Sequence, residues 1–345
     1  MFSSRANPTT SSSLAPASGV VVVGGGYWGK NLVRNFAELQ GLVALVDTRP
    51  EVLASFKQTY PCLATYTTLD EALTHPAVAG VVIATPSPSH APLAKQALLA
   101  DKAVYVEKPL ATNFADAQAL VALSQQRNQV LMVGHLLVYH PVVNRVRYEL
   151  EQGVLGPLQL IESYRLNWNV PRHDRNVWWD LAPHDLSMIQ YLTQLELTHV
   201  HHVQATTTRP DDGKADDVLA QFELTGGLLG RVHTSWVSPT KRVTMRVQGE
   251  GGAFVFDDTL PPDQKLKFVR VARNGHREER ALEFLPLEPL KLECQHFLNA
   301  LHNDQAPQTN ATTGMAIVRW LDQVQAWLTP LEAKAAPTPV PLPAE

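Results

Sequence analysis

The sequence predicts an α/β chain in which a doubly wound parallel sheet is followed by an α+β domain with a largely antiparallel, open sheet. Three observations support this fold class. Short β-branched runs alternate with amphipathic helical stretches up to about residue 133, a glycine-rich turn follows the first run, and from about residue 155 the strands alternate polar and apolar residues. The length of 345 residues is sufficient for two domains with cores of their own.

The first part of the chain combines strands and helices in regular succession. Its strands are continuous apolar runs, as burial on both faces of a parallel sheet requires. They are predicted at Val20–Val23, Val43–Val46, Val81–Thr85, Val104–Val106 and Val130–Val133. The intervening helices are predicted at Trp28–Leu39, Glu51–Thr59, Pro88–Leu99 and Asn113–Arg127. We assign residues 19–140 to this domain.

The second part has strands with one apolar and one polar face, which is typical of an antiparallel sheet with one face on the core. They are predicted at Leu158–Trp168, Val200–Thr208, Val218–Leu224, Leu228–Val237, Arg242–Gln248 and Leu266–Val271. Helices are predicted at Leu181–Leu195, Leu287–Leu301 and Thr312–Leu328. We assign residues 141–330 to this second domain.

Both ends of the chain have the composition of unstructured tails. Residues 1–18 are rich in Ser, Thr, Ala and Pro, and residues 331–345 are rich in Pro. The first segment lacks the apolar centre of a secretion signal, so we expect a cytoplasmic protein. No apolar stretch approaches the roughly 20 residues that span a bilayer, and no membrane partner is expected.

Charge and potential metal ligands exclude further classes of function. The formal net charge is -4 and no run of Lys or Arg occurs, so a nucleic-acid partner is not expected. Cys62 and Cys294 are too few for a disulfide framework or a thiolate metal site. His199, His201 and His202 lack an acidic or thiol partner at suitable spacing, and we therefore predict no metal site.

The turn Gly24–Gly29 fits the pattern Gly-x-Gly-x-x-Gly of a dinucleotide-binding loop. It directly follows a predicted strand and opens a predicted helix, which is the context that this pattern requires. Gly24 permits the tight turn, Gly26 lets the backbone approach a pyrophosphate, and Gly29 allows close packing of the helix on the strand. The N–H groups at the helix N-terminus then face the phosphates. The variable positions, also expected beside the cofactor, are Tyr27 and Trp28.

Asp47 ends the second predicted strand, where a ribose-binding carboxylate is expected. Such a carboxylate accepts hydrogen bonds from the ribose hydroxyls and repels a 2′-phosphate. It favours NAD over NADP, although Arg49 leaves NADP open. The alternative is a structural glycine turn with a capping Asp.

Thr85, Pro86 and His90 follow another strand and are expected to line the cofactor cleft. For His90 the alternative is a helix N-terminal position without a role in binding.

Two further motifs carry candidate catalytic groups. Glu107-Lys108-Pro109 lies at the end of a predicted parallel strand, where a lysine in a partly desolvated cleft can donate a hydrogen bond or carry a proton. Taken alone, such a residue is more often a surface lysine before a turn. Asp180 and His184 are four residues apart at the start of a predicted helix and therefore share one face, with a satisfied core histidine as the alternative. Pro183 is expected within the first helical turn.

The three motifs, in this order and spacing, resemble the glucose–fructose oxidoreductase/inositol dehydrogenase superfamily over about Val20 to Leu328. The resemblance implies an NAD-binding Rossmann domain and a C-terminal α+β domain that binds substrate. The open sheet of that second domain often forms the oligomer interface, so a homodimer or homotetramer is expected. Glu107 is expected beside the cofactor, and the family's catalytic group corresponds to Lys108, Asp180 and His184.

Within that superfamily, residues 26–36, 179–185 and 289–297 look most like sugar-nucleotide 3-dehydrogenases. Those enzymes oxidise C3 of UDP-N-acetylglucosamine or of its uronic acid and feed a 3-aminotransferase, as in lipopolysaccharide or lipid A biosynthesis. The segment Gly134-His135-Leu136-Leu137 is less polar than in many relatives. His135 is nevertheless expected to contact the sugar.

The expected chemistry assigns a role to each catalytic residue. His184 is the expected base, because its unperturbed pKa lies near working pH. Lys108 would hydrogen-bond the reacting oxygen, and Asp180 would support both. The sequence leaves open whether Lys108 or His184 takes the proton. A basic cluster before the catalytic helix is expected to bind the substrate diphosphate, with a solvated basic loop as the alternative. Its members are Arg165, Asn167, Arg172, His173 and Arg175.

Three other functions are compatible with the same sequence. A reductase of keto-sugar nucleotides and a polyol dehydrogenase of the inositol type share the fold. A non-catalytic NAD(H)-sensing module does so as well, since fold alone does not fix function. Lys108 and His184 argue against the sensing module, which would need neither.

Overall fold

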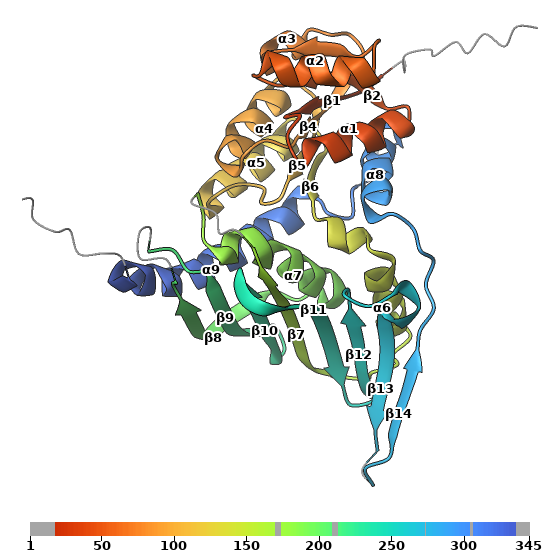
Figure 1. The fold of residues 1–345 in the computed structure, drawn as a ribbon, viewed down its shortest axis with the longest axis vertical. Helices are drawn as coiled ribbons and strands as arrows, with labels where there is room; N and C mark the ends of the chain where they lie inside the picture. Colours follow the sequence, from red (N-terminus) through yellow and green to blue (C-terminus); the bar gives the residue numbers. More distant parts are fainter. Residues whose placement is uncertain (1–17, 170–173, 209–212, 273, 304–305, 336–345) are drawn as a thin grey trace, which may run out of the picture.

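The computed structural model describes residues 18–169, 174–208, 213–272, 274–303 and 306–335. In this part of the chain two sheets lie one above the other, the first near the top and the second near the bottom of Figure 1. The parallel N-terminal sheet and the largely antiparallel second sheet confirm the predicted fold class.

The first sheet is parallel and has the strand order β3-β2-β1-β4-β5-β6. Its strands are β1 Gly19–Val23, β2 Leu42–Val46, β3 Ala64–Tyr66, β4 Val78–Ile83, β5 Ala103–Glu107 and β6 Leu131–Gly134. The helices are α1 Gly29–Glu38, α2 Pro50–Thr59, α3 Leu69–Leu73, α4 His90–Leu99 and α5 Phe114–Gln126, with the short helix η1 at Ser87–Ser89. The strand order reverses between β1 and β4, and ligands of such sheets bind in the crevice beyond their carboxyl ends.

The second sheet has the order β14-β13-β12-β11-β7-β10-β9-β8. Its strands are β7 Leu158–Trp168, β8 Leu197–Thr206, β9 Asp217–Leu224, β10 Leu228–Ser235, β11 Val237–Gly249, β12 Gly252–Asp257, β13 Leu266–Val271 and β14 Arg277–Ala281. The pair β7–β10 is parallel, and the other pairs between neighbouring strands are antiparallel. The remaining helices are η2 Leu136–Tyr139, α6 Pro141–Glu151, α7 Val177–Thr193, η3 Pro262–Gln264, α8 Pro289–Asn303 and α9 Ala311–Ala335.

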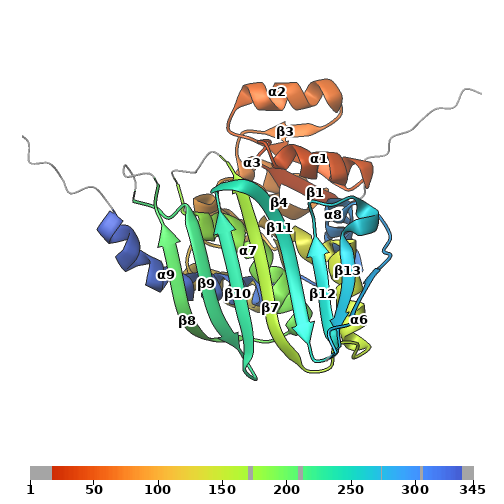
Figure 2. The same ribbon diagram turned by 60° about the horizontal axis from the view of Figure 1, so that its bottom comes forward.

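Helices cover one face of the second sheet. Figure 2 shows α6, α7 and α9 behind the strands, whereas no described helix lies in front of them. The core between α7 and the sheet contains several of the largest fully buried side chains, among them Trp178, Phe222, Trp236 and Trp320. This layering fixes α7, which carries the predicted catalytic pair, against the middle of the sheet. None of the helices in the described ranges is long and apolar enough to cross a bilayer.

Helix α7 begins earlier than predicted, and Pro183 lies inside it rather than in its first turn. The helix starts at Val177 because Asn176 caps it: the Asn176 side chain accepts a hydrogen bond from the Trp179 N–H at 3.1 Å. The predicted start at Leu181 is therefore wrong, because the cap at Asn176 fixes the beginning of the helix four residues earlier.

Helix α9 ends at Ala335, so residues 331–335 are helical and do not belong to an unstructured tail as predicted. Pro330 removes one N–H but does not end the helix. Glu332 explains the extension. Its carboxylate accepts hydrogen bonds from Asn176 Nδ2 at 2.8 Å and from the Ala215 N–H at 3.0 Å, which bind the last turns to the second domain.

Helix α8 packs on the first domain, although it follows the second sheet in sequence. The Phe297 ring meets Phe36 of α1 at 6.4 Å and Tyr105 of β5 at 5.7 Å between centroids, both edge to face. Helix α9 likewise contributes Ala311 and Val318 to the core of the opposite face. The division at residue 140 stays a prediction, since both late helices complete the core of the first sheet.

Candidate functional site

The three glycines of the β1–α1 turn differ in their surroundings, as their predicted roles require. Gly24 has φ +98°, a conformation that side chains rarely adopt. A Cβ on Gly29 would lie 1.8 Å from the Gly24 carbonyl oxygen, so only glycine lets the helix approach the strand. A Cβ on Gly26 would meet nothing within 4 Å. The open space at Gly26 is the cradle that a pyrophosphate group needs.

Asp47 lies beside this turn as predicted. Its carboxylate accepts a hydrogen bond from the Gly25 N–H at 2.8 Å and two from the Arg49 guanidinium at 3.0 and 3.1 Å. Burial raises the pKa of Asp47, but the hydrogen bonds from Arg49 and Gly25 outweigh burial and lower the pKa overall. Asp47 is therefore an ionised acceptor at neutral pH, in the position expected for a contact with ribose hydroxyls.

His90 joins two loops at the carboxyl end of the sheet. Its ring nitrogens lie 2.8 Å from the Thr85 carbonyl oxygen and 2.7 Å from the Pro109 carbonyl oxygen. Burial is the main cause that lowers the pKa of His90. The ring thus holds the loop after β4, which carries Thr85 and Pro86, to the loop after β5. Its predicted contact with the cofactor stays a prediction.

Lys108 and Asp180 meet at the boundary between the two domains. The Lys108 ammonium donates a hydrogen bond to the Asp180 carbonyl oxygen at 2.8 Å and lies 3.8 Å from the Asp180 carboxylate. Lys108 follows β5 and its peptide bond to Pro109 is cis, whereas Asp180 belongs to the first turn of α7. Residues that are 72 positions apart in the sequence are thereby brought together, as the motifs predicted.

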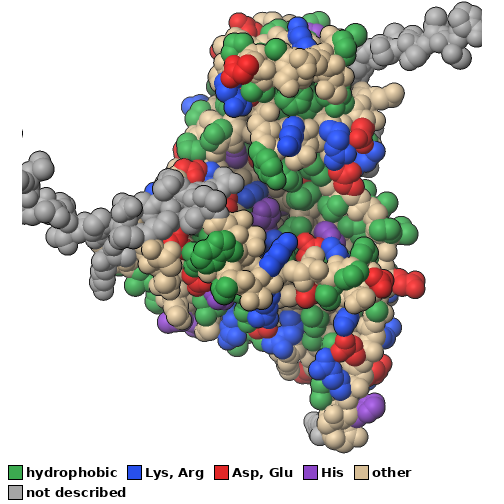
Figure 3. Space-filling view, in the orientation of Figure 1, with side chains coloured by type: hydrophobic (Ala, Val, Ile, Leu, Met, Phe, Trp, Pro, Cys, Tyr) green, Lys and Arg blue, Asp and Glu red, His purple; other side chains and the backbone are tan. Residues whose placement is uncertain are grey.

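Two buried histidines complete this cluster. Burial, followed by the charges of Lys108 and Arg165, lowers the pKa of His184 well below its usual value. Burial and Lys108 lower the pKa of His135 to about 3. Neither ring nitrogen of His135 has a hydrogen-bond partner among the described residues, nor does Nδ1 of His184. Both rings are neutral at working pH and have free capacity for a ligand. Figure 3 shows histidine and basic side chains in the hollow between the domains.

Arg165 is paired within the protein. Its guanidinium donates to both carboxylate oxygens of Asp185, at 2.9 and 3.1 Å, and Asp185 is fully buried. Ser163 donates to the same carboxylate at 2.6 Å, so β7 and α7 are joined directly beside His184. Because Asp185 balances the charge of Arg165, the predicted diphosphate contact of Arg165 stays a prediction. The same holds for Asn167, two residues further along β7.

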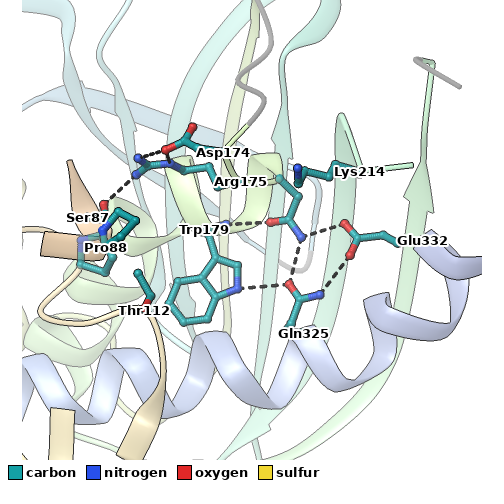
Figure 4. A pocket seen from close by; sticks show the side chains of 11 residues that line it. Ser87, Pro88, Thr112, Asp174, Arg175, Trp179, Lys214, Gln325 and Glu332 are labelled. Atoms are coloured by element: carbon teal, nitrogen blue, oxygen red, sulfur yellow. Dashed lines mark hydrogen bonds and ion pairs between the residues drawn. The ribbon is translucent and has the colours of Figure 1, made fainter. Parts of the chain in front are cut away.

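Arg175 bridges the domains at the edge of the cluster. Its Nη1 donates to the Ser87 hydroxyl at 2.9 Å, and its guanidinium also pairs with Asp174. Figure 4 shows this bridge at one end of a cavity of about 260 Å³. The Trp179 ring forms a wall, and its indole N–H donates to Gln325 at 3.1 Å. Arg172 and His173, predicted members of the same basic cluster, lie outside the described residues.

Trp28 and Glu107 were predicted beside the cofactor, whereas Tyr105 and Glu293, the buried polar groups that accompany them beneath the cofactor loop, were not. The Trp28 indole N–H donates to Glu107 at 2.5 Å, and the Tyr105 hydroxyl donates to the same oxygen at 3.2 Å. Glu293 of α8 is buried beside them. A carboxylate on the apolar face of an amphipathic helix, between Leu290 and Phe297, was the available signal for Glu293.

The residues present fit a dinucleotide. The turn around Gly26 leaves room for the pyrophosphate, and Asp47 is an ionised acceptor for the ribose. Lys108 lies beyond β5, on the other side of β4 from the turn, where the nicotinamide end of such a cofactor would reach. In the part of the chain that the structure describes, no group of three His, Cys, Asp or Glu side chains has the arrangement of a metal site.

Comparison with known proteins supports this interpretation. The chain is 28% identical over 284 residues to a UDP-N-acetylglucosamine 3-dehydrogenase of Acidithiobacillus ferrooxidans, covering 81% of this chain and 87% of that protein. A structure of that enzyme superimposes with a TM-score of 0.79 at 25% identity, covering 92% of this chain and 98% of the other. An NAD-dependent scyllo-inositol 2-dehydrogenase of Bacillus subtilis is 23% identical, covering 69% of this chain and 71% of that protein.

Two family profiles match in succession. Residues 18–135 match the profile described as an oxidoreductase family with an NAD-binding Rossmann fold, and residues 143–255 match the GFO/IDH/MocA C-terminal domain. The predicted superfamily and the predicted cofactor, NAD, are thereby confirmed. The chain belongs to the Gfo/Idh/MocA family of NAD-binding oxidoreductases.

Proposed function

We propose that the protein uses NAD to oxidise the C3 hydroxyl of a UDP-amino sugar of the UDP-N-acetylglucosamine type. The observation that carries this proposal is the convergence of Lys108 with Asp180 and His184 at the domain boundary, beyond the carboxyl end of β5 in the sheet that carries the glycine turn. A cation, a carboxylate and a neutral imidazole at one point are the groups that oxidation of a secondary alcohol needs.

The reaction breaks the C3–H and O–H bonds of the sugar and yields a 3-keto sugar, NADH and one proton. When bound, NAD supplies the acceptor for the hydride at nicotinamide C4. Lys108 donates a hydrogen bond to the reacting oxygen and stabilises its developing negative charge. Burial keeps His184 neutral and therefore in the form that accepts a proton. Burial also lowers its pKa well below the usual value, so the imidazole is a weaker base than its unperturbed pKa predicted. Asp180 positions the Lys108 ammonium through its carbonyl oxygen and carboxylate.

The cavity beside the cluster is proposed to hold the part of the substrate remote from C3. It lies directly beyond Pro109 and Trp179, the neighbours of Lys108 and Asp180 in sequence. Arg175 supplies a guanidinium for a phosphate and Trp179 an aromatic face for a ring. The likeness to a UDP-N-acetylglucosamine 3-dehydrogenase supports a sugar nucleotide over a free polyol.

The first experiment measures NADH formation by the purified protein with NAD and UDP-N-acetylglucosamine, with its uronic acid and with myo-inositol in parallel. A second series adds a keto acid as electron acceptor, because tightly held NADH hides turnover. Lys108→Met is the inactive control, and Lys95→Met, on the exposed face of α4, is its matched surface control. Oxidation of a UDP-sugar by the wild type and by Lys95→Met supports the proposal. The proposal is contradicted if the wild type oxidises inositol but neither UDP-sugar, or if it oxidises none of the three compounds.

The cellular setting follows from this chemistry. A 3-keto sugar nucleotide is a substrate for an aminotransferase, so we propose such an enzyme as the next step, in the cytoplasm where sugar nucleotides are made.

The open face of the second sheet is proposed to join copies of the chain into a dimer or tetramer, because an uncovered sheet face is an available interface.

A further inference from the structure

A buried carboxyl group outside the catalytic cluster has no evident structural explanation. Glu293 of α8 is fully buried, and among the described residues only the Tyr105 hydroxyl acts on its carboxyl group as a hydrogen-bond partner. An ionised carboxylate with a single weak partner is strongly disfavoured in such a place, whereas a neutral carboxylic acid is tolerated.

Glu107, the neighbouring carboxyl group, has the opposite surroundings. It accepts hydrogen bonds from Trp28 Nε1 at 2.5 Å, from the Tyr105 hydroxyl at 3.2 Å and from the Lys108 N–H at 3.3 Å. Hydrogen bonds to a carboxylate stabilise its charged form. If one proton is shared between the two carboxyl groups, these donors favour charge on Glu107 and the proton on Glu293.

The two carboxyl groups act on each other and on Tyr105. Burial, followed by the charge of Glu107, raises the pKa of Glu293 well above its usual value. Burial raises the pKa of Glu107 to about 7. Burial, Glu107 and Glu293 all raise the pKa of Tyr105, so the phenol lies within reach of both groups. Two like charges in one dry site disfavour each other, and their titrations separate.

We propose that Glu293 is a positioning residue of the cofactor site, held as a neutral acid whose proton is donated to the Tyr105 oxygen. Tyr105 thereby keeps its own proton directed at Glu107, and Glu107 holds Trp28 of the glycine-rich turn. The chain of groups thus extends from α8, near the end of the protein, to the loop that receives the pyrophosphate of NAD. This inference concerns NAD binding and does not depend on the proposed sugar substrate.

The other titratable groups around the pair set the conditions of a test. Lys108, at the end of β5, lowers the pKa of Glu107. The charge of Glu293 raises the pKa of Cys294 on α8 and the pKa of Tyr139 on η2. Glu288 also raises the pKa of Cys294, and Arg34 lowers it. NAD binding is expected to strengthen as pH rises and Glu107 loses its proton, because the ionised carboxylate holds Trp28 more firmly.

The experiment measures the dissociation constant of NAD between pH 6 and 8.5, together with the thermal midpoint of the unliganded protein. Glu293→Met removes the proton donor, whereas Glu293→Gln keeps a neutral donor of the same shape. Tyr105→Phe removes the link without changing the core. Gln295→Glu, on the exposed side of α8, is the control for a change of charge on the helix.

A neutral Glu293 predicts about fivefold weaker NAD binding in Glu293→Met and in Tyr105→Phe, as for the loss of one neutral hydrogen bond. Glu293→Gln restores binding and leaves the pH midpoint of the wild type unchanged. A downward shift of that midpoint in Glu293→Gln would show that Glu293 is charged in the wild type and would overturn the proposal. Unchanged NAD binding in Tyr105→Phe would overturn it as well, and this isosteric variant remains informative if Glu293→Met does not fold.

Discussion

At the residue scale, burial decides which groups of the site carry charge. His184 and His135 are neutral because the protein excludes water from them and Lys108 lies nearby. Asp47 is ionised because the Gly25 N–H and Arg49 donate to it. A carboxyl group of this protein is therefore ionised where N–H groups donate to it, as in Asp47, and is proposed to be neutral where such donors are lacking, as in Glu293.

His184→Asn is expected to lower kcat by roughly 10²- to 10⁴-fold, the usual contribution of a positioned proton acceptor. The dissociation constant of NAD should change little, because His184 lies on α7 and not on the cofactor loop. Steady-state kinetics and NAD titration measure the two effects. His199→Asn, at an exposed position of β8, is the matched control. Equal kcat in His184→Asn and the wild type would exclude His184 from the proton transfer.

His135→Leu is expected to reduce the acid sensitivity of the fold. In the unfolded chain a histidine binds a proton near pH 6.5, whereas in the folded protein His135 does so only at about pH 3. The unfolded state therefore binds more protons between these values, and stability falls as pH is lowered through this window. At pH 5 this difference amounts to roughly 2 kcal/mol.

Denaturant unfolding at pH 7 and at pH 5 tests this expectation. The loss of free energy of unfolding between the two pH values should be smaller by about 2 kcal/mol in His135→Leu than in the wild type. His276→Leu, which replaces an exposed histidine, should behave as the wild type. An identical loss in His135→Leu and the wild type would mean that His135 is protonated in the folded protein.

At the scale of elements, side chains join three loops at the carboxyl end of the parallel sheet. Trp28 connects the β1–α1 turn to Glu107 at the end of β5. His90 connects the loop after β4 to Pro109. These contacts hold the cofactor loop and Lys108, the proposed catalytic lysine, in one arrangement.

Gly26→Ala is expected to fold normally and to lose most NAD binding. Its added Cβ meets no protein atom within 4 Å, so stability should be unchanged, but it occupies the space next to the pyrophosphate. Gly29→Ala is the contrasting variant, because its Cβ collides with the Gly24 carbonyl oxygen and should lower the thermal midpoint as well. Thermal unfolding and NAD titration of both variants separate the two effects. Normal NAD binding by Gly26→Ala would remove this turn from the cofactor site.

Strong periodicity made the long elements predictable. Strand β7 has the predicted bounds, and the Rossmann helices lie within a few residues of theirs. Strand β3 and helix α3 are too short to show a period, and all residues of β14 are exposed, so no apolar pattern marks them. Among site residues, the motifs indicated Lys108, Asp180 and His184. For Glu293 the local sequence shows only a carboxylate on the apolar face of a helix; its place beside Glu107 depends on packing between distant segments.

At the scale of the whole molecule, the cluster exists only where the two domains meet. The first domain provides Lys108, and α7 of the second provides Asp180 and His184. The hydrogen bond from Arg175 to Ser87 crosses the same boundary. Domain orientation is therefore part of the proposed catalytic geometry.

Arg175→Gln is expected to raise KM for the sugar nucleotide about tenfold, through the loss of a charge-assisted phosphate contact. The change in kcat should be smaller, because Arg175 does not touch Lys108 in the described contacts. Initial rates over a range of substrate concentrations give both constants. Arg127→Gln, which breaks an exposed pair with Asp101, is the control. A change in kcat alone would assign Arg175 to domain orientation rather than to substrate binding.

The packing of α8 on the first domain also constrains how the chain is made. The ribosome releases β1 to β6 long before residues 289–303, and Phe36 and Tyr105 then lack the cover that Phe297 provides. At usual rates of translation this interval lasts on the order of 8 to 30 seconds. During that time the nascent domain presents an apolar face that chaperones recognise. A chain truncated before α8 would carry every glycine of the cofactor turn and still be expected to aggregate.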